Sequence, residues 1–374
     1  MTMTRRVSFP VLLGAAGSIG CGSPKLASTA AIPASTGRPV QVAVIPPMNW
    51  SAPPVGHRYT LMPTPETTVW GYYDPGAKPA LHVASGDEVE VGTVLTNSPT
   101  NLMRNGLDSK QVEPFLTELY AHRPQRTGGG HILTGPIYMD GADSGDVIEV
   151  RFKEIKLAIP YAYNSFGGRS GYLPEDFQGM NRTKIIPLDS ERMVAHFAPG
   201  IDIPLHPFFG SVGLAPAAAV GPISSAPPGK HAGNLDNKEL VAGTALFVGV
   251  QTKGGLLEIG DGHAGQGNGE VDITALETSL RARIQLVLHK DMHLTFPRAE
   301  TPTHWIAMGI DSNLVTATKT AIRQAIDFLM TQKGLSHEDA YMLVSTACDV
   351  DITELVDGTL GVHVMIPKNI FLPK

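Results

Sequence analysis

The sequence predicts a mainly β protein of the β-sandwich or barrel type, with a pair of helices late in the chain and an α+β character overall. Its 374 residues include 40 glycines and 30 prolines, which favour short strands and many turns. Alternating strand patterns follow the first 56 residues, and helical periodicity comes only late in the chain. Because strands and helices do not alternate along the sequence, a doubly wound parallel sheet is not expected.

A short repeat supports the β assignment. A Ser-Gly-Asp turn at 85–87 leads into an alternating segment at 88–91, and the same turn at 144–146 leads into 147–153. In the second copy, apolar side chains alternate with charged ones. This period of two predicts a sheet strand with one face toward solvent.

The rest of the chain divides in the same way. Residues 161–235 look mostly irregular, and strands resume at 245–250, 256–260 and 283–289. Apolar residues between 322 and 330 then recur at helical spacing, and Gly334 supplies a helix stop. Ser336, followed by Asp339, predicts the cap of a second helix.

The first twenty residues predict an export signal of the lipoprotein type. Arg5 and Arg6 precede an apolar segment that ends at Cys21, the residue expected to be acylated after cleavage. An ordinary signal peptide is the alternative, and both the general and the twin-arginine export routes stay open. We therefore expect residues 1–20 to be the signal, 21–56 a tether rich in Pro, Ala and Ser, and 57–374 the folded domain. The protein would lie in the periplasm or cell envelope, with membrane contact only through the lipid anchor.

Charge excludes one class of partner. The formal net charge is −6 at pH 7, and no cluster of Lys and Arg is present to displace counterions from phosphates. We expect no nucleic-acid partner.

The segment EIGDGHAGQGNGEVDI at 258–273 contains the literal pattern Gly-x-Gly-x-x-Gly of dinucleotide-binding loops. That fingerprint needs a helix that begins within it, so that the pyrophosphate meets the helix N-terminus. The residues that follow, Gln266 to Gly269, would break such a helix. Nucleotide binding is therefore not expected.

A metal site fits the same segment better. Asp261 and His263 lie two residues apart, so on an extended segment both side chains point to one face. A carboxylate and an imidazole can together hold a divalent cation, and Glu270 could be a third ligand or a general base. A polar turn between two strands explains the spacing equally well. The same alternatives apply to the preceding cluster His231, Asn234 and Asp236, whose side chains could simply cap turns.

Taken together, these two segments resemble the acetamidase/formamidase family. The resemblance is carried by PPGKHAGNLD at 227–236 and by GGLLEIGDGHAGQGNGEV at 254–271, with further matches at 131–150, 206–216 and 348–371. It implies a β-rich fold and an amidase that hydrolyses small linear amides, such as formamide or acetamide, to carboxylate and ammonia. It also implies a divalent metal, zinc first and calcium or manganese as alternatives, and a possible homo-oligomer.

Carried onto this chain, the resemblance gives a set of site residues. Asp236, Asp261 and His263 would hold the metal, and Glu270, His263 and Asn234 would act in catalysis. In this hypothesis Glu270 takes a proton from metal-activated water, and Asn234 steadies the tetrahedral oxyanion. The pocket would be completed by His231, Gln266, Glu277 and His131.

Two residues depart from the family pattern, and two alternative functions stay open. Ala232 and Asn268 replace the Gly and Asp that are usual in the family. A ligand-binding envelope lipoprotein without catalysis, built on the same scaffold, is the alternative from another class. A serine amidase that uses Ser165, Ser170 or Ser211 is a weaker one.

Overall fold

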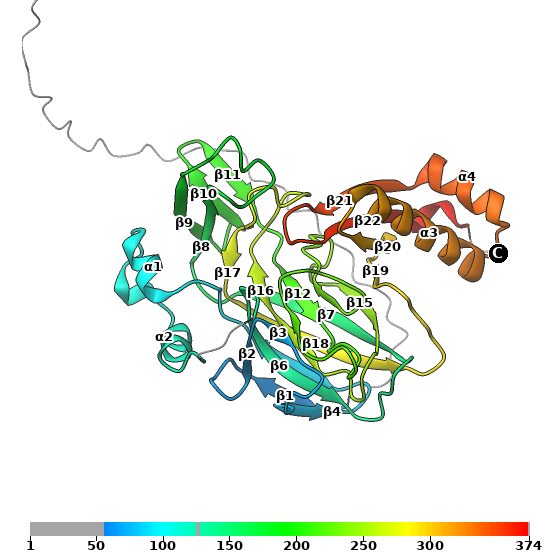
Figure 1. Cartoon of the computed structure of the whole chain (residues 1–374), viewed down its shortest axis with the longest axis horizontal. Helices are drawn as coiled ribbons and strands as arrows, with labels where there is room; N and C mark the ends of the chain where they lie inside the picture. Colours follow the sequence, from blue (N-terminus) through cyan, green and yellow to red (C-terminus); the bar gives the residue numbers. More distant parts are fainter. Residues whose placement is uncertain (1–55, 125–127, 373–374) are drawn as a thin grey trace, which may run out of the picture. The chain divides into compact units, whose positions relative to one another are not determined.

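The computed structural model describes residues 56–124 and 128–372. The fold is mainly β, as predicted, and most strands belong to two large sheets (Figure 1). The first sheet has nine strands, in the spatial order β1 (Arg58–Leu61), β5 (Glu88–Gly92), β18 (Leu280–His289), β7 (Val147–Leu157), β15 (Thr244–Gly249), β19 (Arg298–Glu300), β20 (His304–Asp311), β22 (Leu360–Pro367) and β21 (Asp349–Glu354).

The second sheet has eleven strands and carries the site described below. Its main path is β11 (Ile201–Pro204), β10 (Val194–Ala198), β9 (Asn181–Asp189), β8 (Tyr161–Gly167), β17 (Glu277–Thr278), β16 (Leu257–His263), β12 (Phe208–Gly213) and β14 (Ala232–Asn234). β6 (Ile132–Met139) pairs with β16 and with β2 (Thr68–Trp70) and β4 (Leu81–Val83). A small separate sheet pairs β3 (Tyr72–Tyr73) with β13 (Ile223–Ser224).

The two large sheets bury their apolar faces against each other. One core cluster joins Val150 and Phe152 of the first sheet to Phe209, Val212 and Ile259 of the second. The rings of Phe152 and Phe209 stack across the interface, with centroids 6.4 Å apart. This sandwich places β16 and β12, side by side, with one face in the core.

The late helical pair is present. Figure 1 shows α3 (Leu314–Lys333) and α4 (His337–Ala347) lying against β20 and β22 at one end of the sheets. Gly334 ends α3 in the left-handed conformation, with φ of 69°, and the Ser336 hydroxyl accepts the Asp339 N–H at the start of α4. Both predicted helix signals are confirmed. A short 3-10 turn, η2 (Lys368–Ile370), follows β22.

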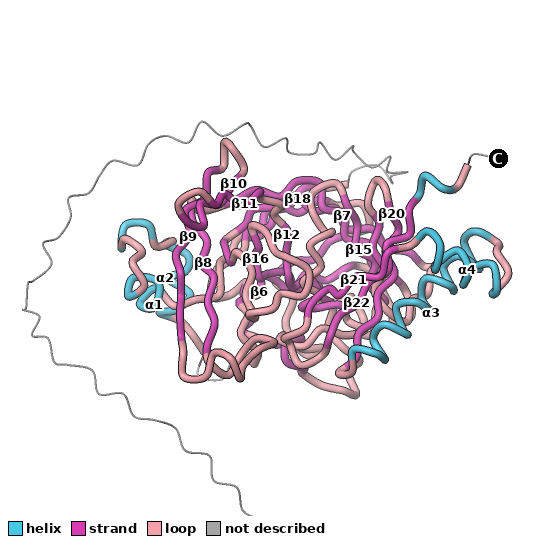
Figure 2. Tube along the Cα trace, turned by 90° about the horizontal axis from the view of Figure 1, so that it is seen from above, coloured by secondary structure: helices cyan, strands magenta, loops and turns pink. Residues whose placement is uncertain are grey.

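Two further helices were not expected from the sequence. α1 (Pro99–Arg104) and α2 (Pro114–Ala121), with the 3-10 turn η1 (Ser109–Gln111) between them, lie at the opposite end of the sheets in Figure 1 and Figure 2. Each begins with a proline in its first turn, where the missing N–H costs nothing. Leu102, Leu116 and Leu119 anchor these helices on a separate core cluster.

The expectation of an irregular segment at 161–235 was wrong, because that range contains β8 to β14. Pairing supplies the regularity that the local sequence lacks: β8 and β9 form an antiparallel pair over Tyr161–Gly167, across a Gly- and Pro-rich connection. The expectation of a solvent-facing side on β7 also fails. Glu149 and Arg151 are only 3% and 5% exposed, and their side chains pair at 2.6 Å.

The N-terminal predictions lie outside the described residues, which begin at residue 56. This applies to the signal at 1–20, the acylated Cys21, and all but the last residue of the tether at 21–56. Within 56–124 and 128–372, none of the helices combines the length and apolar character needed to cross a bilayer.

Candidate metal centre and active site

The glycine segment lies on a strand. Gly260, Asp261, Gly262 and His263 belong to β16, between β6, β12 and β17, and all four are buried. A Cβ on Gly260 would stand 2.6 Å from the Ile132 carbonyl oxygen, and one on Gly262 would stand 2.7 Å from that of Thr278. The glycines therefore allow neighbouring strands to approach β16 closely. No helix begins within the described motif, so this segment lacks the helix N-terminus that a dinucleotide fingerprint needs.

His263 stands between carboxylates from three segments. Its Nε2 is 3.4 Å from Asp261 Oδ2 and 3.4 Å from Glu277 Oε1, and its Nδ1 is 3.9 Å from Asp236 Oδ1. β17 delivers Glu277 directly, because Glu277 is the register partner of His263. Asp261 has a φ of 55°, so its backbone departs from regular strand geometry at the residue whose side chain belongs to the cluster.

A hydrogen-bond chain fixes which nitrogen of His263 carries the proton. Gln266 Nε2 donates to the Asp236 carbonyl oxygen at 2.8 Å, which leaves Gln266 Oε1 to face His263 Nδ1 at 2.9 Å. An amide oxygen can only accept, so Nδ1 must be the donor. The lone pair of neutral His263 is then on Nε2, the nitrogen that faces Asp261 and Glu277. This is the arrangement by which an outer partner orients a metal-binding imidazole.

Asp236 is held from two sides. It follows β14 with φ of 47°, and its N–H donates to the Gly210 carbonyl at 3.1 Å. Asn234 Nδ2 donates to Asp236 Oδ2 at 2.8 Å, which leaves Oδ1 toward His263. Asn234 thus contacts Asp236 through Oδ2 and not through Oδ1, the oxygen that faces His263.

Asp236, Asp261 and His263 have the geometry of a cation site. One ligand atom from each lies within 4.8 Å of the others, and all three residues are buried. Among the described residues, neither Asp236 Oδ1 nor His263 Nε2 has a hydrogen-bond partner, an arrangement that is costly for buried polar atoms. A Cβ on Gly210 of β12 would lie 2.4 Å from Asp236 Oδ1 and 2.6 Å from Asp261 Oδ2. The missing side chain of Gly210 therefore leaves room where these donors converge, and the residues fit a divalent cation.

Two overlapping groups extend the cluster. His263, Glu270 and Glu277 form one, and Asp236, Glu270 and Asp357 form the other, each with ligand atoms within 4.8 Å. Sequence reasoning missed Asp357, which comes from the turn between β21 and β22. That turn is held against the glycine segment, because Leu355 N–H donates to the Gly269 carbonyl at 3.1 Å. The signals for it were the acidic Glu-Leu-Val-Asp-Gly turn at 354–358 and the resemblance over 348–371 that contains this turn.

The carboxyl groups of the cluster have pKa values shifted in both directions. Burial works to raise the pKa of Asp261, but His131 and His263 outweigh it and hold that pKa below its usual value. Burial and then the charge on Asp357 raise the pKa of Glu270 well above its usual value. Burial and then Glu270 do the same for Asp236. For His263, burial works to lower the pKa, but Glu277 and Asp261 outweigh it and raise the pKa well above its usual value. The carboxylates that favour a proton on His263 equally favour a cation beside it.

Of the two remaining predicted residues, His131 contacts the cluster and His231 does not. His131 joins the cluster: its Nε2 is 3.7 Å from Asp261 Oδ2, and its Nδ1 meets the Ser225 hydroxyl at 2.9 Å. His231 packs edge-on against Tyr73, with ring centroids 5.0 Å apart, and none of its described contacts is with the metal-ligand candidates. Burial lowers the pKa of His231 to about 4, so it is neutral at ordinary pH.

The serine alternative gains no support from the described contacts. The Ser211 hydroxyl meets the Tyr73 hydroxyl at 2.8 Å, and the Ser170 hydroxyl donates to the Gly167 carbonyl at 2.9 Å. Ser165 bonds to the Thr274 hydroxyl through its backbone N–H and carbonyl. Among the described contacts, none of the three serine hydroxyls meets a His or Lys that could activate it.

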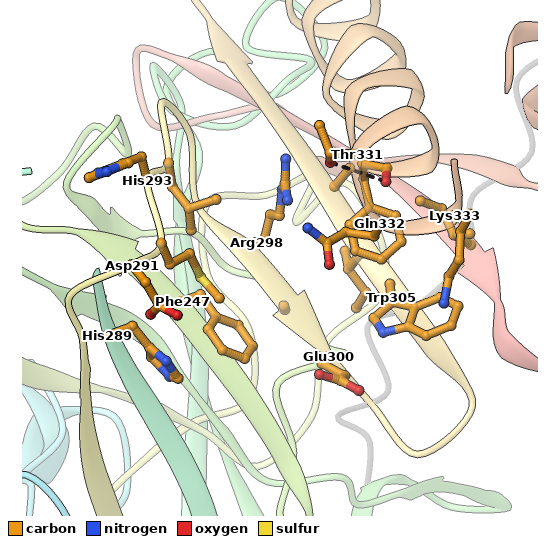
Figure 3. A pocket seen from close by; sticks show the side chains of 17 residues that line it. Phe247, His289, Asp291, His293, Arg298, Glu300, Trp305, Thr331, Gln332 and Lys333 are labelled. Atoms are coloured by element: carbon orange, nitrogen blue, oxygen red, sulfur yellow. Dashed lines mark hydrogen bonds between the residues drawn. The ribbon is translucent and has the colours of Figure 1, made fainter. Parts of the chain in front are cut away.

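Two of the cavities in the described part of the chain differ in their relation to the cluster. One, of about 760 Å³, borders the cluster and is lined by Gln266 and Glu270. The other, of about 700 Å³, lies between β15, β19, β20 and α3, and Figure 3 shows Arg298, Trp305 and Lys333 around it. None of the residues predicted from the sequence lines this second cavity. The cavity of about 760 Å³ is therefore the better candidate for a substrate pocket.

Fold and site together define a β-sandwich protein with a buried carboxylate and imidazole centre that can hold a divalent cation. Residues 218–372 match the model of the Acetamidase/Formamidase family. Similar solved structures include a predicted acetamidase/formamidase from Thermoanaerobacter tengcongensis, at 26% identity and a TM-score of 0.72, with 84% of this chain and 97% of that one covered. An acetamidase from Bacillus halodurans has 26% identity and a TM-score of 0.71, with 83% and 98% covered. One from Yersinia enterocolitica has 27% identity and a TM-score of 0.70, with 87% and 96% covered.

The predicted resemblance to the acetamidase/formamidase family is confirmed by the family model, which matches residues 218–372, and by these three solved structures. A γ-lactamase from Delftia acidovorans, at 20% identity and a TM-score of 0.54, shares the fold. A comparison with curated proteins gives no match.

Proposed function

We propose that this protein is an amidohydrolase that cleaves the C–N bond of small linear amides, of the formamide and acetamide type, to a carboxylate and ammonia. The family and the solved structures similar to the chain support amide hydrolysis in general. The observation that carries the proposal is the convergence of Asp236, Asp261 and His263 on the space left by Gly210.

Asp236, Asp261 and His263 would hold the divalent metal. Their mixture of oxygen and nitrogen donors suits zinc, with calcium or manganese as alternatives. When bound, such an ion supplies Lewis acidity, which polarises a carbonyl group and lowers the pKa of a water molecule. Gln266 supports the site by holding the Nδ1 proton of His263.

Glu270 would move the protons of the reaction. Its carboxylate lies in both overlapping groups of the cluster and also lines the adjoining cavity. As a water oxygen bonds to the amide carbon, Glu270 would accept a water proton and then give it to the leaving nitrogen as the C–N bond breaks. Ammonia leaves and the carboxylic acid ionises, so all atoms and protons are accounted for.

Asn234 would position Asp236 through its 2.8 Å hydrogen bond. Stabilisation of the oxyanion by Asn234 stays a prediction, as do the pocket roles of Glu277, His131 and His231.

The test is ammonia release from a panel of amides, measured beside the metal content of the protein. Glu270→Gln should keep the metal and lose turnover, and His263→Ala should lose both. His196→Ala is the matched control, because His196 is exposed and pairs only with Asp202 in the described contacts, at 2.7 Å. Folded, metal-loaded protein that releases no ammonia from any amide would contradict the proposal and would favour a ligand-binding role.

We further propose, from the N-terminal sequence, that the protein is exported and lipid-anchored at Cys21. Partitioning of the wild type into detergent, lost in Cys21→Ser, would support the anchor. A Cys21→Ser variant that partitions unchanged would contradict it. A homo-oligomer is also proposed, and the mass of the native protein in solution tests it.

A further inference from the structure

The cavity beside the metal centre offers far more room than acetamide needs. Its volume of about 760 Å³ lies within the range of roughly 300–1,000 Å³ that is usual for pockets that hold drug-sized ligands. At about 30 Å³ per water molecule, it would take on the order of 25 waters. An amide with a single methyl group would leave most of this volume to solvent.

One wall of the cavity is apolar and stays partly open to solvent. Phe197 of β10 and Ile203 of β11 are half-buried, and Leu276 lies beside them in the lining. All three belong to, or pack against, the core cluster around Ala162 and Ile186. The wall is therefore the outer surface of an ordered core, held in place whether or not a ligand is bound.

Part of the cavity lining is polar and belongs to the cluster. Glu270 is 6% exposed and lines the cavity together with Gln266, whose amide holds His263. Asp272 and Asn164 also lie in the lining, but their side chains bond to each other at 3.2 Å. A ligand with a polar group and an apolar chain would match both kinds of lining.

We infer that the preferred substrates are linear aliphatic amides with a medium-length acyl chain, whose carboxamide lies at Glu270 and Gln266 while the chain lies along Phe197, Ile203 and Leu276. This inference rests on the proposed amidase function. Ile203 is then a residue that determines specificity, and its effect grows with the length of the acyl chain.

The size of the expected preference follows from burial of methylene groups. Full burial of one methylene favours binding by about fourfold, and a wall open on one side gives roughly twofold to fourfold. From acetamide to hexanamide, four methylenes are added, so kcat/KM should rise by about 16-fold to 256-fold. The ratio of the two kcat/KM values is independent of the fraction of active protein.

The experiment measures kcat/KM for acetamide, butyramide and hexanamide on the full chain. The hexanamide to acetamide ratio should fall about fivefold or more in Ile203→Ala. It should fall further in Ile203→Trp, which fills the cavity and does not depend on a void being tolerated. Ile201→Ala is the control, because Ile201 lies on the same strand, is 50% exposed and does not line the cavity.

The outcomes separate this inference from the amidase proposal. A wild-type ratio above ten that both Ile203 variants lower, and Ile201→Ala does not, supports the inference. Hydrolysis of acetamide with a flat or falling dependence on chain length overturns the inference and leaves the amidase function standing. No hydrolysis of any amide overturns both.

Discussion

Gly210→Ala is the sharpest single perturbation of the proposed metal centre. The added Cβ would lie 2.4 Å from Asp236 Oδ1, 2.6 Å from Asp261 Oδ2 and 2.7 Å from His263 Cε1. Real Cβ contacts of this kind are not shorter than 3.0 Å, so each neighbour must move by several tenths of an ångström. The backbone of Gly210 does not have a positive φ, so alanine introduces no backbone strain.

The displacement acts on all three metal-ligand candidates together. A change in one outer partner of a ligand typically lowers metal affinity about 10-fold to 100-fold, and we expect at least the upper end of that range here. Overpacking of the core should lower the free energy of unfolding by about 1–3 kcal/mol, which leaves the protein folded.

Zinc affinity would be measured by competition with a chromogenic chelator, with circular dichroism as the check on folding. Gly130→Ala is the control, because a Cβ at Gly130 meets no atom within 4 Å. Folded Gly210→Ala protein with the zinc affinity and ammonia release of the wild type would refute the assignment of this space to a cation.

Three further predictions test other parts of the structure. Gln266→Leu removes the acceptor of the His263 Nδ1 proton, so zinc affinity should fall about 10-fold to 100-fold while the melting temperature of the metal-free protein changes little; unchanged affinity would contradict the tautomer assigned here. Gly309→Ala should lower the free energy of unfolding, measured with urea, by about 3 kcal/mol or more, because its Cβ would meet the backbone of α3 as a hard clash; a loss below about 1 kcal/mol would contradict the close packing of α3 on β20. Burial works to raise the pKa of Glu149, but its hydrogen bonds from charged neighbours outweigh burial and lower it, so its stabilising effect is present above the unfolded-state pKa and lost as pH falls through the folded-state value. Glu149→Gln should therefore lower stability at pH 7 and flatten its loss on the acid side, and an unchanged pH profile of urea unfolding would count against that pairing.

The local sequence predicted the ends of the late helices and part of the site. Gly334 and Ser336 act through their own backbone and side-chain geometry, so the residues alone predict the end of α3 and the start of α4. The two-residue spacing of Asp261 and His263 likewise predicted that their side chains meet. It did not predict the positive φ of Asp261, which depends on how β16 pairs with its neighbours.

Contacts between distant segments could not be predicted in this way. Glu277 lies beside His263 because the two residues are register partners on β17 and β16. Asp357 lies beside Asp236 and Glu270 because the turn between β21 and β22 packs there. Gly210 leaves room for side chains that converge on it from β16 and from the residue that follows β14 by two positions. The sequence around Gly210 gives no sign of this. His231 carried the same motif signal as Asp236, yet it packs on Tyr73.

The most direct test of the central claim is the dependence of ammonia release on bound metal in the wild-type protein. Metal would be stripped with a chelator and returned in steps, with bound metal and ammonia release from acetamide and hexanamide measured at each step. We predict that activity is absent without metal and rises in proportion to the bound ion, up to a fixed stoichiometry, and that Asp261→Asn with His263→Ala abolishes both. Full amide hydrolysis by metal-free protein, or metal binding that the double variant retains, would contradict the account.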